Sequence, residues 1–243
     1  MPLLSRENRP WPVSDRPWVM KQVWHDLLFA HWPVEAAALR SLIPPALELE
    51  TFDGAAWLGI IPFRMTGVTP RWVPPLPWFS AFLELNVRTY VSDGTKPGVW
   101  FFSLDAANSF PVAAGRRLFS LPYYRADMEL RREGSMLEYR SVRTDPRGPN
   151  AELAAQYEPT APAEAPSESL TRWLTYRYCL YAARKDGRLF RTEIDHGPWP
   201  LQIAQAQFRI NTMANPLGVR LVGKPLCHFS KMLAVNIWAP TSI

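Results

Sequence analysis

The sequence predicts a mainly β protein of the α+β class, built as an antiparallel sheet that curls or closes and carries a few short helices at its rim. Four hairpins are indicated by turn signals such as Asp53-Gly54 and Asp186-Gly187, each placed between runs of apolar and polar residues that suit strands. The 25 prolines argue against long helices. Apolar residues make up 47% of the 243-residue chain, which is enough for a packed core.

The first half of the chain is predicted to form an arm, a strand, a helix and two hairpins. Residues 1–18 are polar and rich in proline, as expected of an arm on the surface of a single domain at 19–243. The elements expected next are a strand at 23–34, a short helix at 35–44, a hairpin at 47–65 and a hairpin that joins 81–91 to 99–106. Residues 66–79 concentrate proline and tryptophan, so they are either a functional lid or a rigid surface loop.

The second half of the chain is predicted to alternate helices with hairpins. Ser169 is a suitable N-cap for the helix predicted at 170–178. The expected elements are a helix at 109–120, a hairpin at 124–143, a proline-rich excursion with a short strand at 144–169, a helix at 170–178, a hairpin at 179–195, a helix at 201–213 and a strand at 226–240. Repeated hairpins with short helices are typical of a curled or closed antiparallel sheet.

Composition and motifs exclude several classes of function. The formal charge is +5, but no basic run exceeds two residues and the aromatic residues lie largely in predicted core strands, so nucleic-acid binding is not expected. Phosphate-binding glycine motifs are absent and the four histidines lack metal-ligand spacing, so no cofactor and no metal are expected. Cys179 and Cys227 are expected to be reduced thiols. Without a leader-like or membrane-spanning apolar run, the chain is expected to be cytoplasmic, with no membrane partner.

The strand "AFLELNVRTYV" at 81–91 holds the first candidate site. With a period of two residues, Glu84, Asn86, Arg88 and Tyr90 share one face, while apolar residues occupy the other. Side chains two residues apart stand about 6.8 Å apart on such a face, and those four apart about 13 Å. The polar face is either solvated or, inside a closed sheet, the wall of a cavity, with Glu84 as an acid or base and Arg88 as a carboxylate clamp.

Two further stretches carry residues suited to a pocket. In "RRLFSLPYYRAD", Arg116 lies on a predicted helix, and Tyr123 and Tyr124 open the strand that follows. Buried tyrosine hydroxyls need hydrogen-bond partners, although ordinary aromatic packing explains the pair equally. In "IDHGPWPLQ", His196 and Trp199 flank a Gly-Pro turn, where a histidine either acts near neutral pH or makes a structural hydrogen bond.

As a set, these stretches resemble a family of uncharacterised bacterial proteins, DUF2071 or YqjF-like. The resembling motifs are "WHDLLFAHWPV", "FDGAAWLGIIPFRM", "FLELNVRTYV", "GVWFFSLDA", "RRLFSLPYYRADM" and "HGPWPLQ", in order from about residue 20 to 240. That family is distantly similar to acetoacetate decarboxylase, a cone-shaped antiparallel barrel around a central cavity. The resemblance therefore implies that the polar face of 81–91 lines a cavity.

The resemblance also implies a departure from acetoacetate decarboxylase chemistry. Arg116 and Pro122 match the arrangement that precedes the decarboxylase's pair of lysines, and Glu84 matches its cavity glutamate, but the lysine pair falls on Tyr123 and Tyr124. Phenols form no Schiff base. Lys231 is the only lysine within a strand pattern, and it is expected at the surface.

Three functions follow as hypotheses. The first is a cavity that binds a small carboxylate, ketone or aromatic compound without turnover. The second is an acid–base enzyme in which Glu84 moves a proton, Arg88 or Arg116 holds an anion, and Tyr124 donates to an oxyanion. The third is an assembly role through residues 66–79, and a homo-oligomer is left open.

Overall fold

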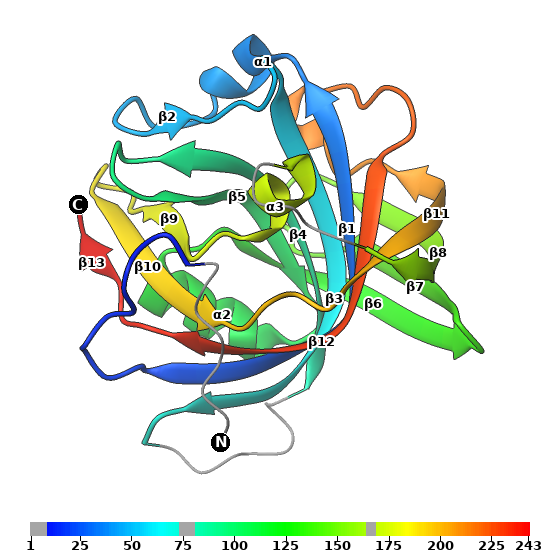
Figure 1. Cartoon of the computed structure of the whole chain (residues 1–243), viewed down its shortest axis with the longest axis horizontal. Coiled ribbons are helices and arrows are strands. Elements are labelled where there is room, and N and C mark those ends of the chain that lie inside the picture. The colour runs from blue at the N-terminus through cyan, green and yellow to red at the C-terminus, as the bar shows by residue number, and fades with distance from the viewer. Residues whose placement is uncertain (1–8, 73–80, 164–168) are drawn as a thin grey trace.

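The computed structural model describes residues 9–72, 81–163 and 169–243. Most of these residues form one 13-stranded sheet that wraps around an interior (Figure 1). Its strands are β1 (Met20–Val34), β2 (Glu48–Leu49), β3 (Ala56–Pro70), β4 (Phe82–Ser92), β5 (Pro97–Ala106), β6 (Tyr123–Glu133), β7 (Met136–Arg143), β8 (Glu152–Pro162), β9 (Cys179–Ala183), β10 (Leu189–His196), β11 (Leu201–Asn211), β12 (Leu226–Ile237) and β13 (Thr241–Ser242). The helices are α1 (Ala36–Arg40), α2 (Ser109–Phe119), α3 (Leu170–Thr175) and the 3-10 turn η1 (Asn215–Leu217).

The sheet closes by two routes that share β12, β1, β3, β4 and β5. One route continues from β5 through β9 and β10 back to β12. The other continues from β5 through β6, β7, β8 and β11 to β12. β5 pairs in parallel with β9 at Val99–Trp100 and with β6 at Leu104–Ala106, whereas the remaining pairings are antiparallel. The α2 crossover between β5 and β6 makes the second parallel pairing possible.

Among the shared strands, β4 separates two interiors and is buried on both faces along most of its length. On β4, Leu85 and Val87 point into a hydrophobic cluster that also contains Tyr139 and Leu153 of the β6–β7–β8–β11 side. The opposite face of β4 points into the ring closed by β9 and β10. The two-residue period predicted for 81–91 is therefore the period of the folded strand.

The mainly β, antiparallel barrel prediction is confirmed, and the expected helix at 201–213 is wrong. These residues form β11, which pairs with β8 over most of its length and with β12 at its start. Alanine and glutamine are good helix formers, but Ala204, Ala206 and Phe208 turn toward the core with a period of two. Ladder hydrogen bonds and burial therefore outweigh local propensity here.

Several element bounds also differ from prediction. The turn at Asp53-Gly54 has positive φ at both residues, but it closes a single bridge from Phe52 to Ala55, and β2 pairs with β4 instead of with β3. The strand in the 144–169 stretch is the 11-residue β8. Residues 66–70 of the expected loop continue β3, and 73–79 lie outside the described residues.

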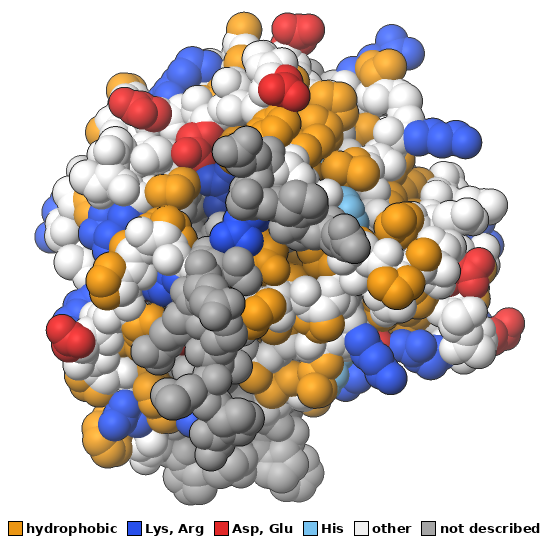
Figure 2. All heavy atoms as spheres, in the orientation of Figure 1, with side chains coloured by type: hydrophobic (Ala, Val, Ile, Leu, Met, Phe, Trp, Pro, Cys, Tyr) orange, Lys and Arg blue, Asp and Glu red, His pale blue; other side chains and the backbone are white. Residues whose placement is uncertain are grey.

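Charged residues of both signs are interspersed over the face seen in Figure 2, without one continuous basic patch. No helix among the described residues combines the length and apolar character needed to cross a membrane. Cys179 and Cys227 are both buried, and neither is in a disulfide.

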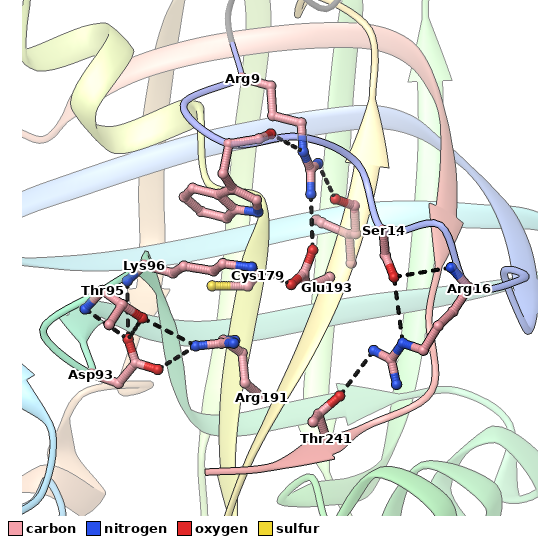
Figure 3. Close-up of polar contacts among 12 residues, drawn as sticks. Arg9, Ser14, Arg16, Asp93, Thr95, Lys96, Cys179, Arg191, Glu193 and Thr241 are labelled. Atoms are coloured by element: carbon pink, nitrogen blue, oxygen red, sulfur yellow. Dashed lines mark hydrogen bonds and ion pairs between the residues drawn. The ribbon is translucent and has the colours of Figure 1, made fainter.

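The described part of the N-terminal arm, residues 9–18, is held against β10 and β13. Figure 3 shows Arg9 donating to Glu193 on β10, at 3.2 Å. Arg9 also donates to Asp195 of the same strand, at 3.2 Å. Farther along, Arg16 donates to Thr241 at 2.9 Å. The guanidinium of Arg9 is almost fully buried, so these ion pairs tie the arm to a strand of the cavity wall.

Candidate functional site

A cavity of about 420 Å³ lies within the ring β1–β3–β4–β5–β9–β10–β12, which closes back on β1. Its walls are mainly apolar and aromatic, with contributions such as Trp24, Leu27, Ile61 and Phe63. This volume suits a small organic molecule. Leu118 of α2 borders the cavity and is 61% exposed, so the edge of the cavity reaches the surface beside that helix.

Strand β4 supplies a row of polar groups to this apolar cavity. Glu84, Asn86 and Arg88 all line it, because alternate residues of a strand share one face. Glu84 and Asn86 are buried, at 3% and 5% exposure. The polar face of 81–91 is thus turned into the barrel.

Glu84 and Tyr123 form a hydrogen-bonded pair at one end of the row. The Tyr123 hydroxyl donates to Glu84 Oε2 at 2.8 Å. Burial raises the pKa of Glu84 to about 8; the Tyr123 hydrogen bond opposes this shift, and the negative charge of Asp105 adds to it. At pH 7 the carboxyl is therefore mostly neutral and keeps an O–H group that can donate to a ligand.

Gly115 on α2 makes room for the Tyr123 ring. A Cβ at position 115 would lie 2.4 Å from Tyr123 Cε2, which is far inside van der Waals contact. The glycine in this helix therefore has a packing reason, since it lets α2 approach the ring whose hydroxyl reaches Glu84.

Asp105 lies behind the β4 wall and supports the site indirectly. It is paired in register with Leu85, whose side chain is on the face away from the cavity. Arg143 Nη2 lies 2.8 Å from Asp105 Oδ1. Burial raises the pKa of Asp105 to about 6, although Arg143 opposes the shift. The Tyr139 hydroxyl donates to the backbone carbonyl of Glu84 at 2.8 Å and fixes the strand at that point.

Two arginines, Arg88 and Arg177, line the cavity where α3 ends. Arg88 Nη2 donates to Leu174 O at 3.4 Å, a weak bond, and Arg177 Nε donates to Trp173 O at 2.7 Å. Arg177 also forms an ion pair with Glu50. Burial lowers the pKa of Arg177 from its ordinary value, and the charge of Arg88 adds to that effect.

His196 and Trp199 complete the polar part of the wall. His196 Nδ1 donates to Gly197 O at 2.7 Å, which leaves Nε2 as the unprotonated nitrogen, and Nε2 has no partner among the described residues. Burial lowers the pKa of His196 to about 4, so the ring is neutral at pH 7. Trp199 Nε1 donates to Thr175 O at 2.8 Å, which holds the indole against the cavity.

Six of the nine site residues expected from the sequence line one cavity: Glu84, Asn86, Arg88, Tyr123, His196 and Trp199. The other three do not. Tyr90 is fully buried beside the cavity lining, where its hydroxyl donates to Leu174 O at 3.0 Å and lies 2.6 Å from His31 Nε2. Tyr90 therefore lies next to the cavity without lining it.

Tyr124 and Arg116 lie outside the cavity lining for two different reasons. Neighbouring residues of a strand point to opposite faces, so Tyr123 lines the cavity and Tyr124 points the other way. The Tyr124 ring packs against Arg143, whose Cζ lies 4.3 Å from the ring centroid. Arg116 instead faces Asp145, at 3.3 Å, in a surface depression on the other side of α2. Neither side chain reaches Glu84 in this arrangement.

Sequence reasoning missed Arg177, Gly115 and Asp105. Arg177 sits just beyond α3 in a stretch read as a helix, and no spacing marks it as a cavity residue. A lone glycine inside a helix pattern was the one available signal for Gly115, since such a residue often has a packing reason.

None of the lysines of the chain lines the cavity; all lie in the described parts. Lys231 is exposed on β12. Among residues 9–72, 81–163 and 169–243, no group of three or more His, Cys, Asp or Glu residues is placed to hold a metal ion. The side chains that line the cavity can supply hydrogen bonds, move a proton and bind an anion.

Comparisons with known proteins agree with this architecture. Residues 21–234 match the family model DUF2071, described as "Uncharacterized conserved protein". The chain is 42% identical over 228 residues to "Uncharacterized protein YqjF" of Bacillus subtilis (strain 168), and the match covers 93% of each chain.

Two solved structures share the fold at low sequence identity. Acetoacetate decarboxylase of Legionella pneumophila is 15% identical, with a TM-score of 0.67 over 98% of this chain and 93% of that one. The enduracididine biosynthesis enzyme MppR, complexed with pyruvate, is 11% identical, with a TM-score of 0.64 over 94% and 92%. At these identities, the likeness establishes the fold alone.

Proposed function

Since this chain belongs to the DUF2071 family of uncharacterized conserved proteins, we propose its function from its own cavity: the protein binds a small organic molecule inside the barrel. The observation that carries the proposal is the buried Glu84–Tyr123 pair facing an apolar void of about 420 Å³. Apolar walls with a few fixed polar groups are the usual make-up of a small-molecule site.

The ligand class follows from the protonation of this pair. With a pKa of about 8, Glu84 presents an O–H donor at pH 7, so it favours an uncharged oxygen acceptor such as a ketone carbonyl. The aromatic walls favour an apolar or aromatic body. Small carboxylates, ketones and aromatic compounds are therefore the candidates, and the pyruvate held by MppR adds 2-keto acids to them.

A Schiff-base reaction is not part of this proposal. The resemblance to acetoacetate decarboxylase implies a lysine pair at Tyr123 and Tyr124, and phenols cannot form an iminium with a ketone. Lys231 is exposed on β12, and no lysine in the described parts of the chain lines the cavity. Binding in this cavity is therefore non-covalent.

Thermal unfolding in the presence of a panel of carboxylates, ketones and aromatic compounds tests the proposal. A ligand raises the unfolding midpoint when it binds the folded state alone. The matched variants are Val68→Trp, which places an indole at the cavity wall, and Val222→Trp at a site 70% exposed. The proposal expects stabilisation of the wild type and of Val222→Trp, and its loss in Val68→Trp. Stabilisation by no compound, or an equal response of all three proteins, would contradict it.

A second candidate function is acid–base catalysis on a small carbonyl or carboxylate compound. The observation that favours it is the pKa of Glu84, which lies close to neutral pH, where a proton-transfer group works best. Consumption of a bound panel compound, lost in Glu84→Gln and kept in the exposed control Glu129→Gln, would support it. Turnover that is the same in all three proteins would exclude Glu84 as the proton-transfer group.

A further inference from the structure

We propose that the end of the cavity beside α3 is a carboxylate subsite, formed by Arg88 and Arg177, and that the ligand is a monocarboxylate with an apolar body. This inference rests on the proposed ligand cavity and names the charge and the orientation of what fills it. Planar guanidinium groups bind carboxylates through paired hydrogen bonds, which makes arginine the suitable residue.

The charges at this end of the cavity do not balance. Arg177 is paired with Glu50, whereas Arg88 has no ion-pair partner among the residues that the structure describes. His196 is neutral at pH 7 and supplies no further charge. One positive charge in an apolar, partly enclosed wall is left for an anion, and a single carboxylate group neutralises it.

Unused hydrogen-bond donors mark the same place. Arg88 Nε and Arg177 Nη2 are both buried without a hydrogen-bond partner, although buried polar groups are nearly always paired. Both side chains line the cavity, so a ligand group that accepts two hydrogen bonds would lie beside them at this end. A carboxylate oxygen pair has this capacity.

The two guanidinium groups are held in place before any ligand binds. Arg88 and Arg177 lie over the ring of Tyr90, with Cζ 5.8 and 4.9 Å from its centroid, and Arg177 also lies 4.3 Å from that of Trp173. Their bonds to Leu174 O and Trp173 O anchor them to the last turn of α3. Such preorganisation lowers the entropy lost on binding.

The row on β4 then sets the direction of the ligand. Glu84 and Arg88 are four residues apart, which places their Cα atoms about 13 Å apart along the strand. Both side chains reach into the void and shorten this span for a ligand. The carboxylate lies at Arg88, the apolar body passes Asn86, and a carbonyl oxygen accepts a hydrogen bond from the O–H group of Glu84.

Binding of 3-benzoylpropionate and of its methyl ester, measured by titration calorimetry, tests this subsite. The two probes share the aromatic ketone and differ in the negative charge. We expect the wild type to bind the acid at least about tenfold more tightly than the ester, since a charge-assisted bond is lost in the ester. We expect Arg88→Met to remove this preference by lowering the affinity for the acid. The affinity for the ester should change less than about twofold.

The controls separate this inference from the ligand cavity itself. Arg140→Met, at a largely exposed arginine of β7, should bind both probes as the wild type does. Arg88→Lys should keep part of the preference for the acid, because it keeps the charge and loses the fork. The comparison of acid and ester in the wild type needs no variant. It therefore still tests the carboxylate subsite if a substitution impairs folding.

Equal binding of acid and ester by the wild type would overturn the carboxylate subsite and leave the ligand cavity intact. The same holds if Arg88→Met weakens both probes alike, or if panel compounds bind and neither probe does. If no compound of the panel binds, the proposed function fails together with the subsite.

Discussion

Replacing Glu84 by glutamine should change how the stability of the protein depends on pH. In the folded state burial raises the pKa of Glu84 from 4.5 to about 8, whereas in the unfolded chain the carboxyl titrates near its ordinary value. Between these two pH values the unfolded chain releases a proton that the folded protein keeps. The contribution of Glu84 to stability is therefore fully present below about pH 4.5 and is lost as the pH rises to about 8.

The size of the effect follows from the pKa shift. Each pH unit between the two pKa values costs about 1.4 kcal/mol of unfolding free energy. Allowing for incomplete titration near pH 5, the wild type should lose about 2.5 kcal/mol between pH 5 and pH 7 through this one group. Glutamine is close in shape to the protonated acid and does not titrate, so Glu84→Gln should not show this loss.

Urea denaturation of both proteins at pH 5, 6, 7 and 8, followed by tryptophan fluorescence, measures the difference. Asp105 and the other titrating groups are present in both proteins, so their contributions largely cancel. The free energy of unfolding of Glu84→Gln, taken relative to wild type, should rise with pH by about 2.5 kcal/mol from pH 5 to 7. Glu129→Gln, at an exposed glutamate of β6, is the control. A Glu84→Gln difference that does not change with pH would refute a neutral, buried Glu84.

Three other substitutions test neighbouring parts of the account. Tyr123→Phe removes the hydrogen bond that lowers the pKa of Glu84, so the pH-dependent loss of stability should continue above pH 8 when the denaturation series is extended to higher pH; an earlier end than in the wild type would contradict this. Gly115→Ala should lower the unfolding free energy by about 1–3 kcal/mol through the clash with Tyr123, although alanine normally stabilises helices; stabilisation would contradict the close packing. Arg9→Met removes the buried guanidinium that donates to Glu193 and Asp195, which should cost about 3 kcal/mol at pH 7 in urea denaturation; no loss would show that the arm is not held by these pairs.

The polar wall of the cavity could be predicted from the sequence because side chains of a strand alternate between its two faces. Once the 81–91 strand is assigned and the resemblance implies a barrel, Glu84, Asn86 and Arg88 must share one interior face. The same rule explains the error at Tyr123 and Tyr124. Only one of two neighbouring residues can face the cavity, and the register of β6 against β5 decides which one does.

Other parts of the structure depend on contacts that no local pattern encodes. The helix-forming residues of 201–213 become β11 because β8 and β12 offer unpaired ladder positions on either side. Arg177 reaches the cavity from the end of α3 and forms an ion pair with Glu50, which lies 127 positions away in the sequence. The pairing of β2 with β4 likewise follows from tertiary packing, since the turn between 52 and 55 is compatible with an ordinary hairpin.

Borohydride reduction of the protein saturated with 3-benzoylpropionate, followed by intact-mass measurement under denaturing conditions, tests most directly that ligands are held without an amine. A ketone bound to a lysine as a Schiff base becomes a stable secondary amine under these conditions. The protein should bind the keto acid before reduction and keep its unmodified mass afterwards. A mass increase equal to the reduced adduct, traced to a lysine, would contradict the central claim.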